Sequence, residues 1–132
     1  APTVTAWAGN PPVVDPVTVT DPPLPKSLSG SGESMGPSIS PNGSFVVFLS
    51  SANDLVANDQ NGMVVDIFLR SRTNHATTLV SVNARGGGGG NGHSAYVPVT
   101  PEGREVAFAS EASNPVANDT NQASNVFFRD AS

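Results

Sequence analysis

The chain has 132 residues, a net charge of −5 and no cysteine. This length corresponds to about one domain, and the lack of cysteine excludes disulfides, thiolate zinc sites and cysteine nucleophiles. The six lysine and arginine residues form no basic stripe, and no apolar run approaches the roughly 20 residues of a membrane helix. We therefore expect neither nucleic acid binding nor membrane insertion.

Residues 1–33 differ from the rest because seven of the 12 prolines fall within the first 25 positions. Proline lacks an amide donor and favours extended chain. We expect an extended proline-rich segment in which residues 3–8 and 17–20 alternate as single edge strands do. The start Ala1-Pro2-Thr3 resembles a mature end left by signal-peptide removal, and with the single lysine it favours an extracellular or cell-surface location.

From Ser34 onwards the chain repeats itself at a spacing of about 60 residues, with a turn, a loop and a strand returning in the same order. The matching runs are Ser40-Pro41-Asn42-Gly43 with Thr100-Pro101-Glu102-Gly103, Val56-Ala57-Asn58-Asp59 with Val116-Ala117-Asn118-Asp119, and, after a one-residue deletion, Asp66-Ile67-Phe68-Leu69-Arg70 with Asn125-Val126-Phe127-Phe128-Arg129. Such ordered self-similarity indicates one supersecondary unit used twice. The two units span residues 34–93 and 94–132.

Each unit has the composition of antiparallel strands joined by tight turns. Proline presets φ at the start of each turn and glycine accepts a positive φ, while valine, threonine and phenylalanine favour strands. The expected strands are residues 37–40, 45–50, 65–70 and 77–82 in the first unit, and 95–100, 105–110 and 125–129 in the second. The predicted fold is all-β, with two blade-like antiparallel four-stranded units, the second of which lacks its last strand.

The pattern S-P-x-G-x-x-V-x-F-x-S, followed by a long N-D-x-N loop and then by D-[IV]-F-x-R, resembles the TolB-type β-propeller repeats of bacterial envelope and secreted proteins. The resemblance covers residues 37–130 and implies a blade-like four-stranded antiparallel sheet for each unit. A propeller closes its ring with about four to eight blades, whereas this chain carries two.

The missing last strand predicts how the chain functions. An edge of unpaired N–H and C=O groups templates pairing with another strand, and residues 3–8 or 13–20 fit this gap, within one chain or between chains. The candidate assembly residues are Val4, Ala6 and Trp7. We expect an extracellular structural subunit that self-assembles as a homo-oligomer or filament by N-terminal β-strand exchange.

Two alternatives stay open: a truncated propeller-type protein-binding module of a secreted or envelope protein, and a carbohydrate-active domain. We do not expect an enzyme, because no nucleophile elbow is present and His75 and His93 lie in loops without a metal-binding partner motif. The glycine run of residues 86–90 lacks the ending of a phosphate loop. We expect this run to be a flexible connection between the two units.

The loop of the first unit carries a candidate calcium site at Asp59, Asn61 and Asp66, because calcium prefers six to eight oxygen ligands. The second copy, with Asp119, Asn121 and Asn125, has one carboxylate fewer and should bind more weakly. The alternative is that these residues form side-chain-to-backbone turns that hold a long loop.

Overall fold

Seven strands form two antiparallel sheets in the part of the chain that this computed structural model describes, namely residues 17, 29–95, 100 and 105–131. None of these residues lies in a helix, so the all-β prediction is confirmed, and none belongs to a helix long and apolar enough for a bilayer span. The strands are β1 (Ser34–Ile39), β2 (Phe45–Ser50), β3 (Asp66–Ser71), β4 (Thr77–Leu79), β5 (Ser94–Ala95), β6 (Glu105–Ser110) and β7 (Asn125–Asp130).

The first sheet has the strand order β1-β2-β3-β4. Its central strands β2 and β3 are buried at most positions, as is typical of strands that are covered on both faces. Their register pairs Phe48 with Phe68, and the two rings stack with centroids 5.7 Å apart. The edge strand β1 is mostly exposed and carries an irregularity between Met35 and Ser38.

The turn between β1 and β2 forms at the predicted Ser-Pro-Asn-Gly run. Gly43 has a φ of 70°, a conformation that glycine adopts readily because it has no Cβ. Its N–H donates to the carbonyl of Ser40 at 2.8 Å. The hydroxyl of Ser40 accepts the N–H of Phe45 at 3.0 Å. These two bonds fix the residue at which β2 begins.

The second sheet, β5-β6-β7, follows the same plan with three strands. β6 pairs with β7 over its whole length, from Glu105 opposite Asp130 to Ser110 opposite Asn125. The predicted strand 95–100 lies largely outside the described residues, and β5 comprises Ser94–Ala95. Within the described chain, no strand of the second sheet corresponds to β4.

The repeat extends to single hydrogen bonds. In the first unit, the Ser50 hydroxyl donates to the Glu33 carbonyl at 2.9 Å. In the second, the Ser110 hydroxyl donates to the His93 carbonyl at 3.3 Å. Both donors and both acceptors are 60 positions apart. Because Glu33 takes part, the repeat reaches upstream of Ser34.

A pair of glycines confirms this upstream extension. A Cβ on Gly32 would lie 2.5 Å from the amide nitrogen of Ala52, and a Cβ on Gly92 would lie 2.7 Å from that of Ala112. Such distances leave no room for a side chain, so both positions require glycine. The runs Gly-Ser-Gly-Glu-Ser and Gly-Asn-Gly-His-Ser, which start at residues 30 and 90, carried this signal in the sequence.

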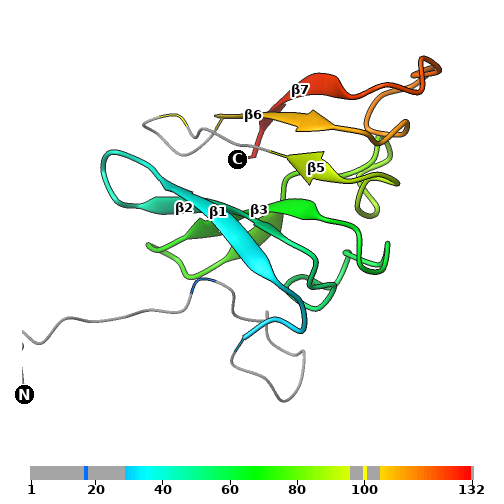
Figure 1. Ribbon diagram of the computed structural model, residues 1–132. Coiled ribbons are helices and arrows are strands. Elements are labelled where there is room, and N and C mark those ends of the chain that lie inside the picture. Colours follow the sequence, from blue (N-terminus) through cyan, green and yellow to red (C-terminus); the bar gives the residue numbers. More distant parts are fainter. Residues whose placement is uncertain (1–16, 18–28, 96–99, 101–104, 132) are drawn as a thin grey trace, which may run out of the picture.

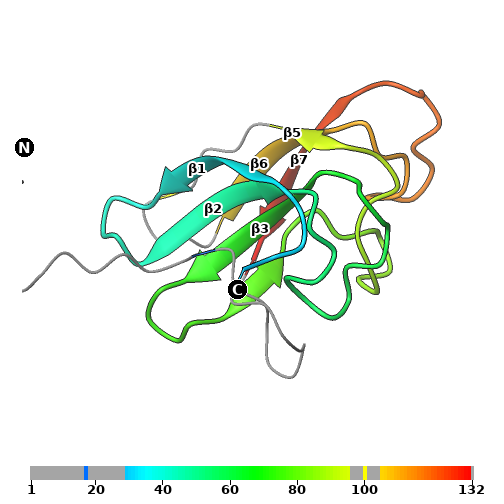
Figure 2. The ribbon, with the colours of Figure 1, turned by 60° about the horizontal axis from the view of Figure 1, so that its bottom comes forward.

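The two sheets pack face to face, with the second sheet stacked on the first (Figures 1 and 2). The buried contact between them consists of Val47, Ile67, Leu69 and Val80 from the first unit and Val106 and Phe108 from the second. Phe127 of β7 packs against this cluster. Burying each such side chain contributes about 1.5–3 kcal/mol, so the contact joins both units into one core.

The opposite face of the first sheet has a core of its own. Phe48 and Phe68 pack there with Leu55 and Val56 from the loop between β2 and β3, and Val17 is packed against them. The order through the molecule is therefore Val17, the first sheet, the second sheet and the outer face of the second sheet.

Candidate functional site

The three candidate metal ligands of the first unit lie together in a buried polar centre, which comprises Asp59, Asn61 and Asp66. Asp59 and Asn61 belong to the loop between β2 and β3, and Asp66 is the first residue of β3. Asp59 is 3% exposed and Asp66 is fully buried. A buried carboxylate is costly unless hydrogen bonds or a cation compensate it. The hydrogen-bond partners of each carboxylate oxygen therefore determine whether the centre favours ionised carboxylates.

Asp66 has a donor for each carboxylate oxygen. The Ser81 hydroxyl donates to Oδ1 at 2.6 Å, and the Asn61 side-chain amide donates to Oδ2 at 2.6 Å. The same Asn61 amide group donates to the Gly90 carbonyl at 2.8 Å. Asn61 thus links the start of β3 to the beginning of the second unit.

The end of the glycine run, Gly89 and Gly90, lies against the polar centre, whereas a Cβ on Gly86 or Gly87 would meet nothing within 4 Å. A Cβ on Gly89 would collide with the side chain of Asn61, so only glycine fits there. The N–H of Gly90 donates to the Ser81 carbonyl at 2.8 Å. The physical role of these glycines is close approach of main chain to buried side chains.

Two buried oxygens of the polar centre have no hydrogen-bond partner, namely Oδ1 of Asp59 and Oδ1 of Asn61. The amide hydrogens of Asn61 are directed to Asp66 and Gly90, so they cannot serve Asp59. A buried acceptor without a partner costs about 1–3 kcal/mol. Each oxygen therefore requires a hydrogen-bond donor or a cation, and a proton could serve only Asp59.

The same burial shifts the acidity of the centre. Burial and, to a smaller extent, the negative charge of Asp66 raise the pKa of the Asp59 carboxyl to about 7, although a hydrogen bond from the Asn61 main chain opposes this. Burial also raises the pKa of Asp66, against hydrogen bonds from Ser81 and Asn61 and the charge of His93. Near neutral pH, Asp59 exchanges between its protonated and ionised forms, and a positive ligand favours the ionised form.

The second candidate set, Asp119, Asn121 and Asn125, also lies together but is differently bonded. The Asn125 side-chain amide donates to Oδ2 of Asp119 at 3.0 Å and to Oδ1 of Asn121 at 3.1 Å. In return, the Asn121 amide donates to Oδ1 of Asn125 at 2.9 Å. Asn125 thus satisfies oxygens on the two side chains whose counterparts carry the unpartnered oxygens of the polar centre.

No group of three or more histidine, cysteine, aspartate and glutamate side chains within the described ranges is placed to hold a metal ion. The polar centre has two carboxylates and one amide. A cation bound there would take its further ligands from main-chain carbonyls or water, which is the ligand chemistry of calcium and not of zinc.

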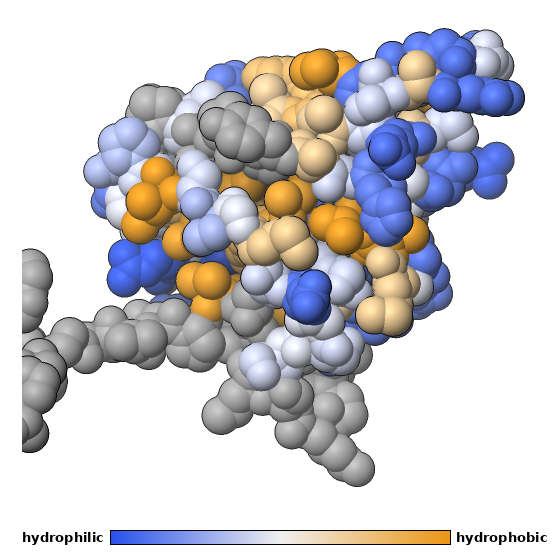
Figure 3. Space-filling model, in the orientation of Figure 1, coloured by the Kyte–Doolittle hydropathy of each residue, from blue (hydrophilic) through white to orange (hydrophobic). Residues whose placement is uncertain are grey.

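A second feature, not anticipated from the sequence, is an exposed apolar face on the second sheet. This open face comprises Ala107, Ala109, Val126 and Phe128. Val126 is 80% exposed and Phe128 is 67% exposed, and the space-filling view has hydrophobic surface over β7 (Figure 3). Large apolar side chains grouped on one sheet face are typical of an interaction surface.

The repeat gives the reason why this face is unusual. Val126 and Phe128 correspond to Ile67 and Leu69, which are 0% and 4% exposed because the second sheet covers them. The signal in the sequence was the match between the two strand runs. It showed that the same face of each unit is apolar, but not that one copy of the face is uncovered.

The outer edge of β7 adjoins this face. In the first unit, β4 pairs with the equivalent edge of β3, with Leu69 opposite Thr78. Within the described chain, β7 pairs with β6 alone. The candidate assembly residues Val4, Ala6 and Trp7, which the sequence assigned to this edge, lie outside the described residues.

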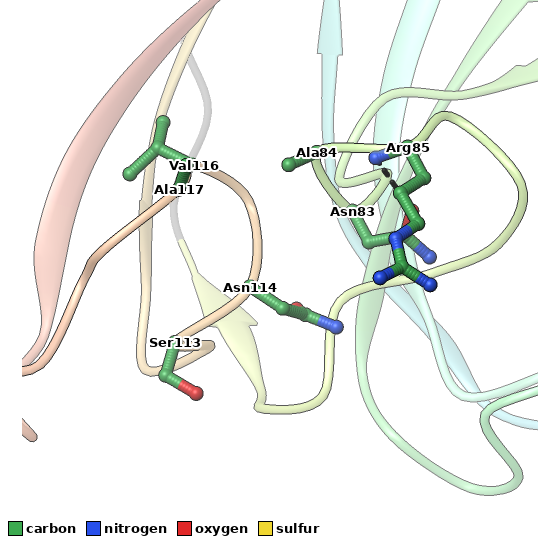
Figure 4. A pocket seen from close by; sticks show the side chains of 7 residues that line it. All are labelled: Asn83, Ala84, Arg85, Ser113, Asn114, Val116 and Ala117. Carbon is green, nitrogen blue, oxygen red and sulfur yellow. Dashed lines mark hydrogen bonds between the residues drawn. The ribbon is translucent and has the colours of Figure 1, made fainter.

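An open hollow of about 430 Å³ lies where loops of the two units meet (Figure 4). Residues 83–85 line one side, and residues 113, 114, 116 and 117 line the other. The N–H of Ala84 donates to the Asn114 carbonyl at 2.7 Å, which ties the two loops together. The lining offers polar groups and the cation of Arg85, but no carboxylate or histidine.

The chain matches no model of a known protein family, no curated protein and no solved structure. The resemblance to TolB-type repeats therefore stays a prediction. Function has to be inferred from the open face, the edge of β7 and the polar centre.

Proposed function

We propose that this protein is an extracellular structural subunit that self-assembles end to end, each copy covering the open face and the outer edge of β7 in the next. The observation that carries this proposal is the exposure of Val126 and Phe128, whose counterparts are buried by the neighbouring unit. Burying two such side chains contributes about 1.5–3 kcal/mol each. Continuing the stack of units with another copy would recover this free energy.

The edge of β7 supports strand exchange as the means of attachment. In the first unit, β4 fills the corresponding edge through residues 77–79. A strand from a neighbouring copy would take this place, and main-chain hydrogen bonds would supply affinity. We assign residues 3–8 to this donor strand, with Val4, Ala6 and Trp7 as the side chains that anchor it.

The position of Val17 supports exchange between copies. Val17 packs on the first sheet, at the opposite end of the stack from the open face. When a second copy places its first sheet on the open face, the face that carries its Val17 comes against β7. The donor strand and the covering sheet then come from one neighbour. A head-to-tail contact of this kind, if it does not close into a ring, produces a filament.

The alternative function is a propeller-type protein-binding module within a longer protein of the secreted or envelope type. The stacked sheets and the repeated serine hydrogen bonds favour it. In that case a further unit of the same chain would cover the open face, and the protein would remain monomeric when complete. In neither role do the described residues take part in catalysis.

Sedimentation velocity over a range of concentrations tests the proposal. The unaltered chain should form species larger than the monomer. Phe128→Glu should lower the association constant by roughly 30-fold or more, because burial of an aromatic side chain at an interface contributes about 2 kcal/mol or more. The matched control is Met35→Glu, which charges a residue of β1 that is 46% exposed and pairs with Leu49 on the side of the first sheet away from the proposed contact, and it should leave association unchanged. A monomeric unaltered chain at every concentration, or equal association of the two variants, would contradict the proposal.

A further inference from the structure

We infer that the polar centre binds one calcium ion through Asp59, Asn61 and Asp66, and that the equivalent place in the second unit is filled by the amide group of Asn125. This inference concerns a ligand and is independent of the proposed assembly. It starts from the two unpartnered oxygens, Oδ1 of Asp59 and Oδ1 of Asn61, since the other buried side-chain N and O atoms of the described residues have partners.

The second unit offers a comparison in a more exposed setting, where Asn121 is exposed and Asp119 and Asn125 are part-buried. There, the N–H groups of the Asn125 amide point at Asp119 and Asn121, with donor–acceptor distances of 3.0 and 3.1 Å. Asp66 takes the place of Asn125 in the first unit and has no N–H to offer. With Asp66 in place of Asn125, the first unit therefore lacks the N–H donors of the amide. It also has an additional negative charge at that position.

A divalent cation would replace the lost N–H partner and would also balance the added negative charge. Asp59 and Asp66 together carry two negative charges when ionised, and Asn61 adds a neutral oxygen. A protonated Asp59 would satisfy one of the unpartnered oxygens but would leave the Asp66 charge buried. A bound cation neutralises the pair, and it provides a partner to the oxygens of Asp59 and Asn61 together.

The ligand chemistry favours calcium over magnesium or zinc. Carboxylate, amide and main-chain oxygens suit hard cations, and calcium tolerates the irregular arrangement that a loop offers. Magnesium requires nearly ideal octahedral geometry, whereas calcium accepts an irregular set of six to eight oxygens. Zinc prefers nitrogen and sulfur ligands.

Binding would also tie the two units together. Asn61 donates to the carbonyl of Gly90, and Gly90 donates to that of Ser81, which in turn donates to Asp66 through its side chain. The calcium ligands are thus part of one hydrogen-bonded ring that includes the start of the second unit. Occupancy should therefore stabilise the whole chain and not the loop alone.

Isothermal titration of chelator-treated protein with calcium chloride tests the inference. The unaltered chain should bind one calcium ion, and its melting temperature should rise by about 4 °C or more when calcium is saturating. Asp66→Asn, which supplies the amide found at Asn125, should weaken binding by at least tenfold. Asp59→Asn should do the same and serves if the first variant does not fold. The matched control is Asp119→Asn, which should bind calcium as the unaltered chain does.

Three results would overturn the inference: no calcium binding by the unaltered chain, undiminished binding by the folded Asp66 and Asp59 variants, or loss of binding in Asp119→Asn. Magnesium chloride in the same titration should bind at least tenfold more weakly. Equal binding of the two metals would overturn the assignment to calcium.

Discussion

Ile67 in β3 and Val126 in β7 occupy equivalent positions in the two units, yet Ile67 is fully buried and Val126 is 80% exposed. Both lie on the same face of their sheets, as the matched registers of β2 with β3 and β6 with β7 require. The second sheet covers Ile67, whereas none of the described elements covers Val126 to a comparable degree. One position of the repeat is thus core in one copy and surface in the other, and this difference carries the predictions on stability and assembly.

Phe108→Ala should destabilise the monomer strongly, whereas Phe128→Ala should hardly change its stability. Phe108 is buried between the sheets, so its loss leaves a cavity and should lower the free energy of unfolding by about 3–5 kcal/mol. Phe128 is 67% exposed, and its replacement should change stability of the monomer by less than about 0.5 kcal/mol. Chemical denaturation at low protein concentration measures both values. Similar losses for the two variants would show that the outer face of the second sheet is already covered within one chain.

A synthetic peptide of residues 1–14 should bind the chain from which residues 1–25 have been deleted, and it should stop growth of the assembly. The physical reason is that a donor strand satisfies main-chain groups at the edge of β7 and buries apolar side chains. The same peptide with Trp7→Ala should bind at least tenfold more weakly, since Trp is a frequent anchor of interfaces. Fluorescence anisotropy with a labelled peptide gives both affinities. Normal polymerisation of the deleted chain would exclude residues 3–8 as the donor.

Asn125→Asp should create in the second unit the electrostatic problem of the first. The change removes the donors to Asp119 and Asn121 and places a second carboxylate beside Asp119. In the presence of a chelator, stability should fall by about 1 kcal/mol or less, because Asn121 is exposed and Asp119 and Asn125 are only part-buried. Calcium at millimolar concentration should restore part of this loss, as seen in melting temperatures. Asn125→Ala, which removes the donors without adding charge, is the control and should not respond to calcium at this site.

Metal-free protein should become more stable as the pH falls from 8 to about 5.5. The pKa of Asp59 is raised by burial and by Asp66 to about 7, from an ordinary value of 3.8. Between these two values the folded chain binds more protons than the unfolded chain, so the free energy of unfolding decreases as pH rises through this window. Above pH 7 the cost of ionising Asp59 is present in full. Thermal melts in chelator across this range give the slope.

The control for the pH prediction is Asp59→Asn, which should flatten the slope, while Asp119→Asn should retain it. Saturating calcium should also flatten it, because the cation favours the ionised carboxylates. An unchanged slope in Asp59→Asn would assign the pH dependence to other groups.

Much of the architecture followed from local sequence. Strands β2 and β6 begin and end where the sequence predicted, at residues 45–50 and 105–110. This succeeded because proline and glycine set the turns before them and valine and phenylalanine fill them, and these preferences act over a few residues. The clustering of Asp59, Asn61 and Asp66 was likewise foreseen, since the three residues lie close together in the sequence.

Contacts between distant residues decided the rest. Ile67 and Val126 occupy the same position in the repeated strand motif. Only the stacking of one sheet on the other determines which of the two is buried. Gly89 packs against Asn61, which lies 28 positions earlier in the chain. Local sequence preferences do not encode a contact over this separation. Whether the oxygens of Asp59 and Asn61 find partners depends on the same contact. Sequence by itself determined the strands, the turns and the repeat, because their causes are local; burial and polar pairing were decided by tertiary structure, because they depend on which distant surfaces meet.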